Sequence, residues 1–311
     1  MKFETSTCSC SRRTFLKAGL GCGAYTVLAS QFAPLSVRRV FAATPSGETV
    51  ITEPYARVEK LAEGVWAVVS TPLTGGFTTV SNGGIVQGKN GVLAIEGFMS
   101  PKGGEWLRGV AEKLTGQPLT HVALTHYHSD HVGGIKGYLK KDTNPAVIAT
   151  EKTKATMSGG DAVTISNLET LDLGGRKIHF QSLRGHTDSD MTISLDDPSV
   201  AWCGDLLWNG MFPNYVDARP TELLTNCKTL LANSSTTYVP GHGSLPNETE
   251  IENYIAVLEN IGEAAQKSIE AGTPASEGWK SYKVPASLGE WALFRPNIFE
   301  AAFVAWEKEV N

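Results

Sequence analysis

The stretch His126-Tyr127-His128-Ser129-Asp130-His131 decides how the chain is interpreted, because it places three imidazoles and one carboxylate within six residues. Imidazole and carboxylate groups are ligands for Zn²⁺ and similar borderline cations. His126 and His128, two residues apart, can project the same way, whereas Asp130 and His131 turn toward a second point. This spacing predicts two neighbouring metal sites.

The residues before this cluster predict where it sits in the fold. Residues 119–125, LTHVALT, form an apolar run that is typical of a buried strand. Sheets in α/β proteins usually carry their chemistry at the carboxyl ends of the strands. We therefore expect the histidine cluster at the carboxyl end of a strand.

The H-x-H-x-D-H pattern after a strand resembles the hallmark of the metallo-β-lactamase superfamily. Further segments match the rest of that family's ligand set, in the expected order: Gly185-His186-Thr187, Gly204-Asp205 and Pro240-Gly241-His242-Gly243. The resemblance implies one metal bound by His126, His128 and His186, a second bound by Asp130, His131 and His242, and Asp205 as a bridge. One departure is Glu96, which stands where the family usually carries Asp at the end of an early strand.

The resemblance also implies an α+β fold, a four-layer αββα sandwich. Hydrophobic periodicity agrees with two successive halves, each with strands followed by helices. Strands are expected at 64–69, 81–86, 91–95, 168–171, 177–183, 191–195 and 200–203, and helices at 101–115, 132–140, 220–232 and 248–271. The aromatic-rich segment 288–310 is expected to form a helix that closes the sandwich.

The N-terminus carries a second motif, Ser11-Arg12-Arg13-Thr14-Phe15-Leu16-Lys17, followed by a mildly apolar, glycine-rich stretch. This pattern resembles a twin-arginine export signal. Cleavage is expected after Ala42, so residues 1–42 would be the signal peptide and residues 43–311 one metallo-β-lactamase-like domain. The predicted protein is periplasmic or otherwise exported, uses the twin-arginine translocase, and keeps no stable membrane anchor. A transmembrane anchor is disfavoured by Gly19, Gly21 and Pro34 within the apolar stretch.

Charge and cysteine content narrow the function further. The chain from residue 43 has 21 basic and 31 acidic residues, a net charge of −10 against −5 for the whole sequence. Nucleic acid is therefore not an expected partner, because phosphate binding needs a basic surface. Cys203 and Cys227 remain after cleavage, either as a disulfide or as buried free thiols.

The ligand set implies a mechanism. Two Zn²⁺ ions, or iron or manganese in their place, would share a hydroxide that is a strong nucleophile at neutral pH without any Ser or Cys. Asp130 is the predicted catalytic residue, which orients this hydroxide and relays its proton. Loops at 71–77, 188–190 and 207–212 are expected to contact a small-molecule substrate. The prediction is an exported dinuclear zinc hydrolase acting on a small carboxylic ester, lactone or cyclic amide, β-lactams included.

The sequence also bears on alternative functions. The carbapenem-hydrolysing branch carries Cys where this chain has Asp205, which argues against a penicillin-type substrate. A mononuclear iron dioxygenase acting on a persulfide is the main alternative, and retention of His131 and His242 argues against it. A metal-binding protein without catalytic activity is a further alternative, which the complete set of ligand residues disfavours. His121 and His179 lie within apolar strand patterns and are expected to pack there rather than to bind metal.

Overall fold

The computed structural model describes residues 47–71, 77–139, 143–157, 165–166 and 168–310. The predicted signal peptide, its cleavage point and residues 72–76 of the predicted 71–77 substrate loop lie outside the described residues. Among the described residues, no helix combines the length and apolar character needed to cross a membrane.

The first half of the chain forms an eight-stranded sheet whose strands follow chain order. Strands β1 to β5 pair antiparallel, and β5 to β8 pair parallel. The strands are β1 (Glu48–Glu53), β2 (Ala56–Ala62), β3 (Val65–Ser70), β4 (Gly83–Gln87), β5 (Val92–Ile95), β6 (His121–Ala123), β7 (Ala146–Ile148) and β8 (Ile165–Ser166).

The second half forms a five-stranded sheet in the order β13-β12-β11-β10-β9. Strands β12 and β13 run parallel, and the other pairs are antiparallel. The strands are β9 (Thr170–Asp172), β10 (Lys177–Ser182), β11 (Met191–Leu195), β12 (Val200–Trp208) and β13 (Thr237–His242).

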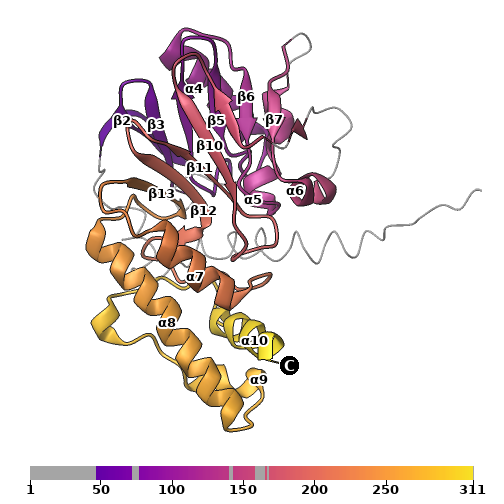
Figure 1. The fold of residues 1–311 in the computed structure, drawn as a ribbon, viewed down its shortest axis with the longest axis vertical. Coiled ribbons are helices and arrows are strands. Elements are labelled where there is room, and N and C mark those ends of the chain that lie inside the picture. The colour runs from indigo at the N-terminus through magenta and orange to yellow at the C-terminus, as the bar shows by residue number, and fades with distance from the viewer. Residues whose placement is uncertain (1–46, 72–76, 140–142, 158–164, 167, 311) are drawn as a thin grey trace, which may run out of the picture.

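Helices cover the outer face of each sheet. Helix α4 packs on the first sheet, whereas α7, α8 and α10 form a helical group beside the second sheet (Figure 1). The helices and 3₁₀ turns are α4 (Pro101–Thr115), α5 (Ser129–Val132), η1 (Ile135–Tyr138), α6 (Glu151–Thr156), α7 (Pro220–Leu230), α8 (Glu248–Glu270), α9 (Ala275–Gly278), η3 (Trp279–Ser281), η4 (Ala286–Leu288) and α10 (Ile298–Val310). The layers follow the order αββα, which confirms the predicted sandwich.

Strand alternation explains why the two sheets stack. On β3, Val65, Ala67 and Val69 belong to the apolar cluster between the sheets, whereas Trp66 and Val68 belong to the cluster under α4. Successive side chains of a strand point to opposite faces, so one buried strand serves two core layers. Trp202 of β12 crosses the interface and donates its indole N–H to the carbonyl of Gly83, 3.0 Å away.

Most predicted elements are confirmed within a few residues, and two are wrong. The helix expected at 132–140 is replaced by the end of α5 and the 3₁₀ turn η1. Gly133, Gly134 and Gly137 disfavour a continuous helix because glycine has low helix propensity, and a Cβ on any of them would clash with backbone oxygens of residues 97–101. The helix expected over 288–310 begins only at Ile298, just after Pro296. Its Phe299 and Phe303 are buried in its own domain, as expected.

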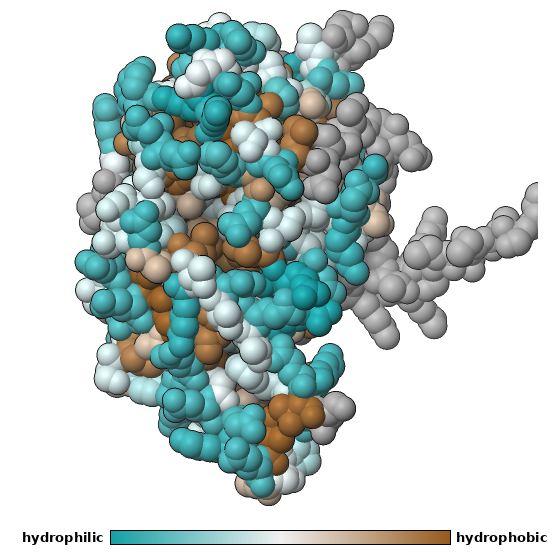
Figure 2. Space-filling view, viewed as in Figure 1, coloured by the Kyte–Doolittle hydropathy of each residue, from teal (hydrophilic) through white to brown (hydrophobic). Residues whose placement is uncertain are grey.

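The surface is largely hydrophilic on the face shown in Figure 2, with hydrophobic residues in smaller groups between the polar ones. Among the described residues, the exposed large hydrophobic side chains are Val50, Leu168, Val216 and Val310. They come from separate parts of the chain, and single exposed apolar residues are normal for a folded domain.

Candidate metal centre

The seven predicted ligands come from both sheets. His126 and His128 follow β6, and Asp130 and His131 lie in α5. His186 lies between β10 and β11, Asp205 is part of β12, and His242 ends β13. Strands β6 and β13 run parallel to their neighbours β5 and β12, so their carboxyl ends deliver these side chains to one edge of the sandwich.

The structure brings all seven side chains together in two groups. In each group the candidate ligand atoms lie within 4.8 Å of one another; the groups are His126, His128, His186 and Asp205, and Asp130, His131 and His242. The six residues other than Asp205 divide into the two sets that the resemblance implied, and Asp205 is grouped with the first set. His121 and His179 lie outside both groups: His121 contacts Thr120 through Nδ1 at 2.8 Å, and His179 contacts Asp196 through Nε2 at 3.0 Å.

Asp205 lies between the two groups and faces both. Its Oδ2 atom is 3.2 Å from Nε2 of His186 and 3.8 Å from Nε2 of His126. Its Oδ1 atom is 3.2 Å from Nε2 of His131 and also 3.2 Å from Nε2 of His242. One carboxylate therefore offers an oxygen to each group, which is the arrangement of a bridging ligand.

The absence of a side chain at Gly241 leaves room for the carboxylate of Asp205. A Cβ atom on Gly241 would lie 2.0 Å from Oδ1 of Asp205. Gly243 has φ of +92°, a conformation that favours glycine. The Pro240-Gly241-His242-Gly243 motif therefore contains its glycines because the chain turns next to the shared carboxylate.

The polar atoms that point into the two groups fit a cation. Five of these atoms are buried and make no hydrogen bond of normal geometry with the described residues: Nε2 of His126, His131 and His242, and Oδ1 of Asp130 and Asp205. Buried polar groups nearly always have a partner, and an ion can be that partner. His128 Nδ1 and His186 Nε2 also converge to 2.9 Å. Nitrogen and carboxylate donors of this kind fit Zn²⁺ and related divalent metals.

Electrostatics divide the histidines into two types. Burial lowers the pKa of His126 well below its usual value and that of His186 to about 4. Burial acts the same way on His131 and His242, but the nearby carboxylates, Asp205 foremost, overcome it; the pKa of His131 is well above its usual range and that of His242 is about 9. The site is therefore negative at its centre, where a cation is stabilised.

Glu96 supports His131 from behind. Its Oε1 atom lies 3.1 Å from Nδ1 of His131 and accepts a 2.5 Å hydrogen bond from Thr125 Oγ1. Glu96 is almost fully buried, at 1% exposed, and has φ of +80°, a conformation with a steric cost for a non-glycine residue. Thus, despite its extra methylene, Glu96 reaches the ring nitrogen of His131 that faces away from the candidate metal position.

Asp217 contacts His128 in a similar way. Its Oδ2 atom lies 3.1 Å from Nε2 of His128 and accepts a 3.0 Å hydrogen bond from the hydroxyl of Tyr127. Carboxylates that accept from the second ring nitrogen fix the tautomer and orientation of a metal-binding histidine. Sequence reasoning missed Asp217, because it lies 89 residues from His128 and no local spacing marks it.

Asn82 ties the two halves of the site together and was also missed. Its side-chain amide donates to the carbonyls of Pro240 and Gly243, at 2.9 and 2.8 Å, and its Oδ1 accepts from the backbone N–H of Ser70. The residue joins the first sheet to the turn that carries His242. It lies in a glycine-rich strand start, where an asparagine gives no distinctive signal.

Two of the predicted substrate loops, 207–212 and 188–190, are mostly buried. In the 207–212 loop, Leu207, Trp208, Met211 and Phe212 are all buried, so this loop packs instead of presenting its large side chains. In the 188–190 loop, Ser189 and Asp190 are buried and only Asp188 is partly exposed. Asp190 accepts from both the N–H and the hydroxyl of Thr187, and burial raises its pKa to about 7.

The structure answers the question of cysteine pairing. Cys203 and Cys227 are free, buried thiols and not a disulfide.

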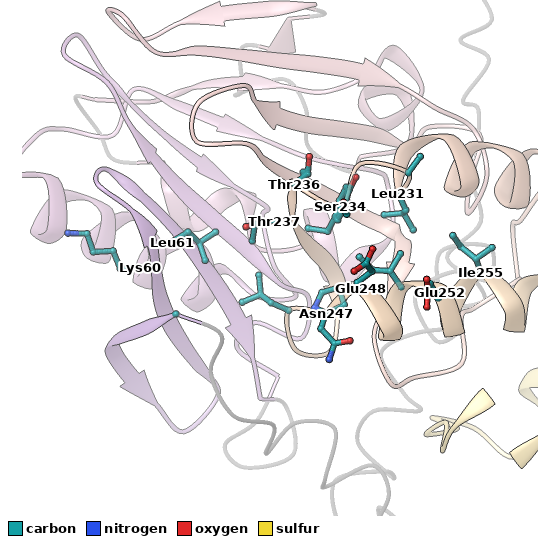
Figure 3. Close-up of a pocket in the computed structure, with 16 residues that line it drawn as sticks. Lys60, Leu61, Leu231, Ser234, Thr236, Thr237, Asn247, Glu248, Glu252 and Ile255 are labelled. Carbon is teal, nitrogen blue, oxygen red and sulfur yellow. The ribbon is translucent and has the colours of Figure 1, made fainter. Parts of the chain in front are cut away.

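A pocket of about 470 Å³ lies between the start of α8 and the strands β2 and β13 (Figure 3). None of the seven predicted ligands lines this pocket, whose walls include Lys60, Thr236 and Asn247, so it is separate from the metal centre.

Comparison with known proteins agrees with this architecture. The sequence model of the metallo-beta-lactamase superfamily matches residues 77–242, more than half of the chain. The chain is 25% identical over 199 residues to "Metallo-beta-lactamase type 2" of Bacillus sp. (strain 170), covering 60% of this chain and 76% of the relative. It is 33% identical over 93 residues to "Hydroxyacylglutathione hydrolase" of Prochlorococcus marinus (strain MIT 9301), covering 30% of this chain and only 37% of the relative.

Solved structures share the fold. A metallo-beta-lactamase from Pontibacter korlensis superposes with a TM-score of 0.54 at 21% identity, over 66% of this chain and 99% of its own. One from Erythrobacter litoralis gives 0.55 at 20% identity, over 68% of this chain and 99% of its own. With its two-sheet sandwich and its paired His/Asp groups, the chain belongs to the metallo-β-lactamase superfamily and is a metal-dependent hydrolase.

Proposed function

We propose that this protein is a dinuclear zinc hydrolase that cleaves a small carboxylic ester, lactone or cyclic amide. The position of Asp205 carries the proposal, because its two oxygens face histidines of separate groups at 3.2 Å each. A single metal would need only one of the groups. The second group, Asp130, His131 and His242, is fully buried and has its own convergent ligand atoms, which argues against the mononuclear iron alternative.

The residues of the site have distinct roles in this proposal. His126, His128 and His186 would hold one Zn²⁺, Asp130, His131 and His242 the other, and Asp205 would be shared. Bound there, the two ions would supply a nucleophile from water at neutral pH and polarise the carbonyl of the substrate. Oδ2 of Asp130 lies 3.3 Å from His242, while its Oδ1 is buried without a hydrogen bond and is available to orient that water and receive its proton.

The relatives support the class of bond. The names "Metallo-beta-lactamase type 2" and "Hydroxyacylglutathione hydrolase" describe cleavage of an amide ring and of a thioester, which both proceed by attack of water on a carbonyl carbon. Asp205, in place of the Cys of the carbapenem-hydrolysing branch, favours an ester or lactone over a penicillin-type substrate. The net charge of −10 from residue 43 onward disfavours a polyanionic substrate.

We propose further that the protein is exported through the twin-arginine route. The Arg12-Arg13 motif supports this, and a route that carries folded proteins suits a protein that acquires its metal before crossing. Replacing both arginines with lysine should leave the full-length chain in the cytoplasm, whereas the unaltered protein should appear in the periplasm beginning at Ala43. An exported double variant would contradict the proposal.

Elemental analysis and a substrate panel test the catalytic function. We expect about two zinc ions per chain and turnover of an ester, a lactone or a chromogenic cephalosporin. His186→Ala should lose metal and at least 100-fold in kcat/KM, whereas His179→Ala, whose ring lies outside both groups, should keep both. One iron per chain without hydrolysis would overturn the dinuclear assignment.

A further inference from the structure

The segment 291–295 reaches the metal centre from a part of the chain that the family match does not include. The match ends at residue 242, whereas this segment lies between η4 and α10. Ala292 is buried and pairs with the loop after β12, donating to the carbonyl of Gly210 at 2.9 Å and accepting from the N–H of Phe212 at 3.0 Å. These bonds fix the segment against the strand that carries Asp205.

Phe294 contacts one group of ligands through a stack of rings. Its ring lies 5.7 Å from that of Trp208, with only 14° between the planes. Trp208 in turn stacks on His242, with 4.1 Å between the ring centres and 30° between the planes. The indole N–H of Trp208 donates to the backbone carbonyl of Asp205 at 3.0 Å. Phe294 therefore packs against Trp208, and Trp208 in turn holds the ring of His242 in position.

Arg295 contacts the other group through an asparagine. Its Nη2 atom donates to Oδ1 of Asn214 at 3.2 Å. The backbone carbonyl of Asn214 is 2.9 Å from Nδ1 of His186, the ring nitrogen opposite the one that faces Asp205. Asn214 is 2% exposed, so its position depends on these contacts and on its packing. Arg295 also lies 5.8 Å from the centre of the Phe294 ring, which couples the two side chains.

We propose that Phe294 and Arg295 are positioning residues of the metal centre, so that this C-terminal segment fixes one histidine of each metal site. This inference rests on the proposed two-metal function. Contacts behind metal-binding histidines typically change metal affinity 10- to 100-fold when they are removed. The segment would thus make metal binding depend on the helical group outside the shared family region.

Competition against a chelator measures the effect directly, with zinc as the probe and the full mature chain as the protein. Phe294→Ala should weaken one of the two bound zinc ions about tenfold, Arg295→Ala should weaken the other, and the double variant should weaken both. Asn214→Ala keeps the carbonyl that faces His186 but removes the Oδ1 that accepts from Arg295 and from the N–H of Val216. It should weaken zinc at least as much as Arg295→Ala, and adding Arg295→Ala to it should cause no further loss.

Matched variants separate positioning from simple loss of folding. Trp306→Ala truncates a half-buried aromatic residue of α10 that packs near Gly262, and it should leave both zinc affinities unchanged. Phe294→Tyr keeps the flat ring, so its two zinc affinities should equal those of the wild-type protein. Phe294→Leu keeps apolar bulk without the ring face and serves as the second test if Phe294→Ala does not fold.

The outcomes distinguish this inference from the proposed function. Unchanged zinc affinities in folded Phe294→Leu and Arg295→Ala would overturn the inference and leave the dinuclear hydrolase standing. If the wild-type chain binds two zinc ions but hydrolyses none of the panel, the substrate assignment fails, and the affinity changes still decide the inference. A wild-type chain that binds no metal would overturn both.

Discussion

The carboxylate of Glu96 lies 3.1 Å from Nδ1 of His131, on the side of the ring that faces away from Asp205. This contact leaves Nε2 of His131 free to point at the candidate metal position. It also explains how the chain uses a glutamate where its family usually has the shorter aspartate. Glu96 has φ of +80°, and its Oε1 atom contacts both His131 of α5 and Thr125.

Loss of this charge should weaken metal binding without unfolding the protein. Glu96→Gln keeps the size of the side chain but removes the negative charge beside His131. We expect the weaker affinity to appear at one zinc ion, by about tenfold, measured by chelator competition. Glu63→Gln, at an exposed residue paired with Lys60, is the control and should change nothing. Equal affinities for the two variants would show that Glu96 does not support His131.

Gly241 should tolerate no side chain. A Cβ there would lie 2.0 Å from Oδ1 of Asp205, so Gly241→Ala must displace the shared carboxylate. We expect loss of metal and of at least 100-fold in kcat/KM, because Asp205 faces both groups. Gly109→Ala is the opposite case. It lies in α4 with open space around its Cβ, and it should stabilise the protein by about 0.5–1 kcal/mol through helix propensity.

Both glycine variants can be judged from thermal unfolding and elemental analysis of the same preparations. A Gly241→Ala protein that keeps its metal would contradict the steric argument. A lower midpoint for Gly109→Ala would show that its Cβ is not accommodated.

Asn82 should contribute strongly to the stability of the contact between the two sheets. Asn82→Ala leaves the carbonyls of Pro240 and Gly243 and the N–H of Ser70 buried with one partner fewer each. We expect the free energy of unfolding to fall by about 2–4 kcal/mol, because buried polar groups without partners cost about 1–3 kcal/mol each and partly relax. Urea unfolding measures the loss. Asn233→Ala, in the exposed turn before β13, should cost less than 1 kcal/mol.

Cys203 and Cys227 should be unreactive in the folded protein. Both thiols are buried, and burial raises the pKa of each well above its usual value, so the reactive thiolate is suppressed at neutral and mildly alkaline pH. In a protein that begins at residue 43, a thiol reagent at pH 8 should label neither Cys203 nor Cys227 in the native state and both after unfolding in denaturant. A native protein without free thiols after unfolding would indicate a disulfide instead.

The sequence was sufficient for features that depend on local spacing. Local sequence patterns predict the H-x-H-x-D-H turn, the alternation of β3 and the amphipathic helices α4 and α8. The resemblance to a family supplied the order of His186, Asp205 and His242, and the structure places them in the implied groups. That these residues bind metal stays a prediction.

Only the tertiary structure decided the contacts between distant segments. Asp217 reaches His128 across 89 residues, Asn82 reaches Gly243 across 161, and Phe294 contacts Trp208 from the segment before α10. No periodicity marks these residues, because their partners are set by how two sheets and an outer helical layer pack. The sequence by itself determined which groups can bind a cation, since ligand chemistry and strand period are local. Packing decided which carboxylates and rings hold those ligands in place, since that depends on distances through space.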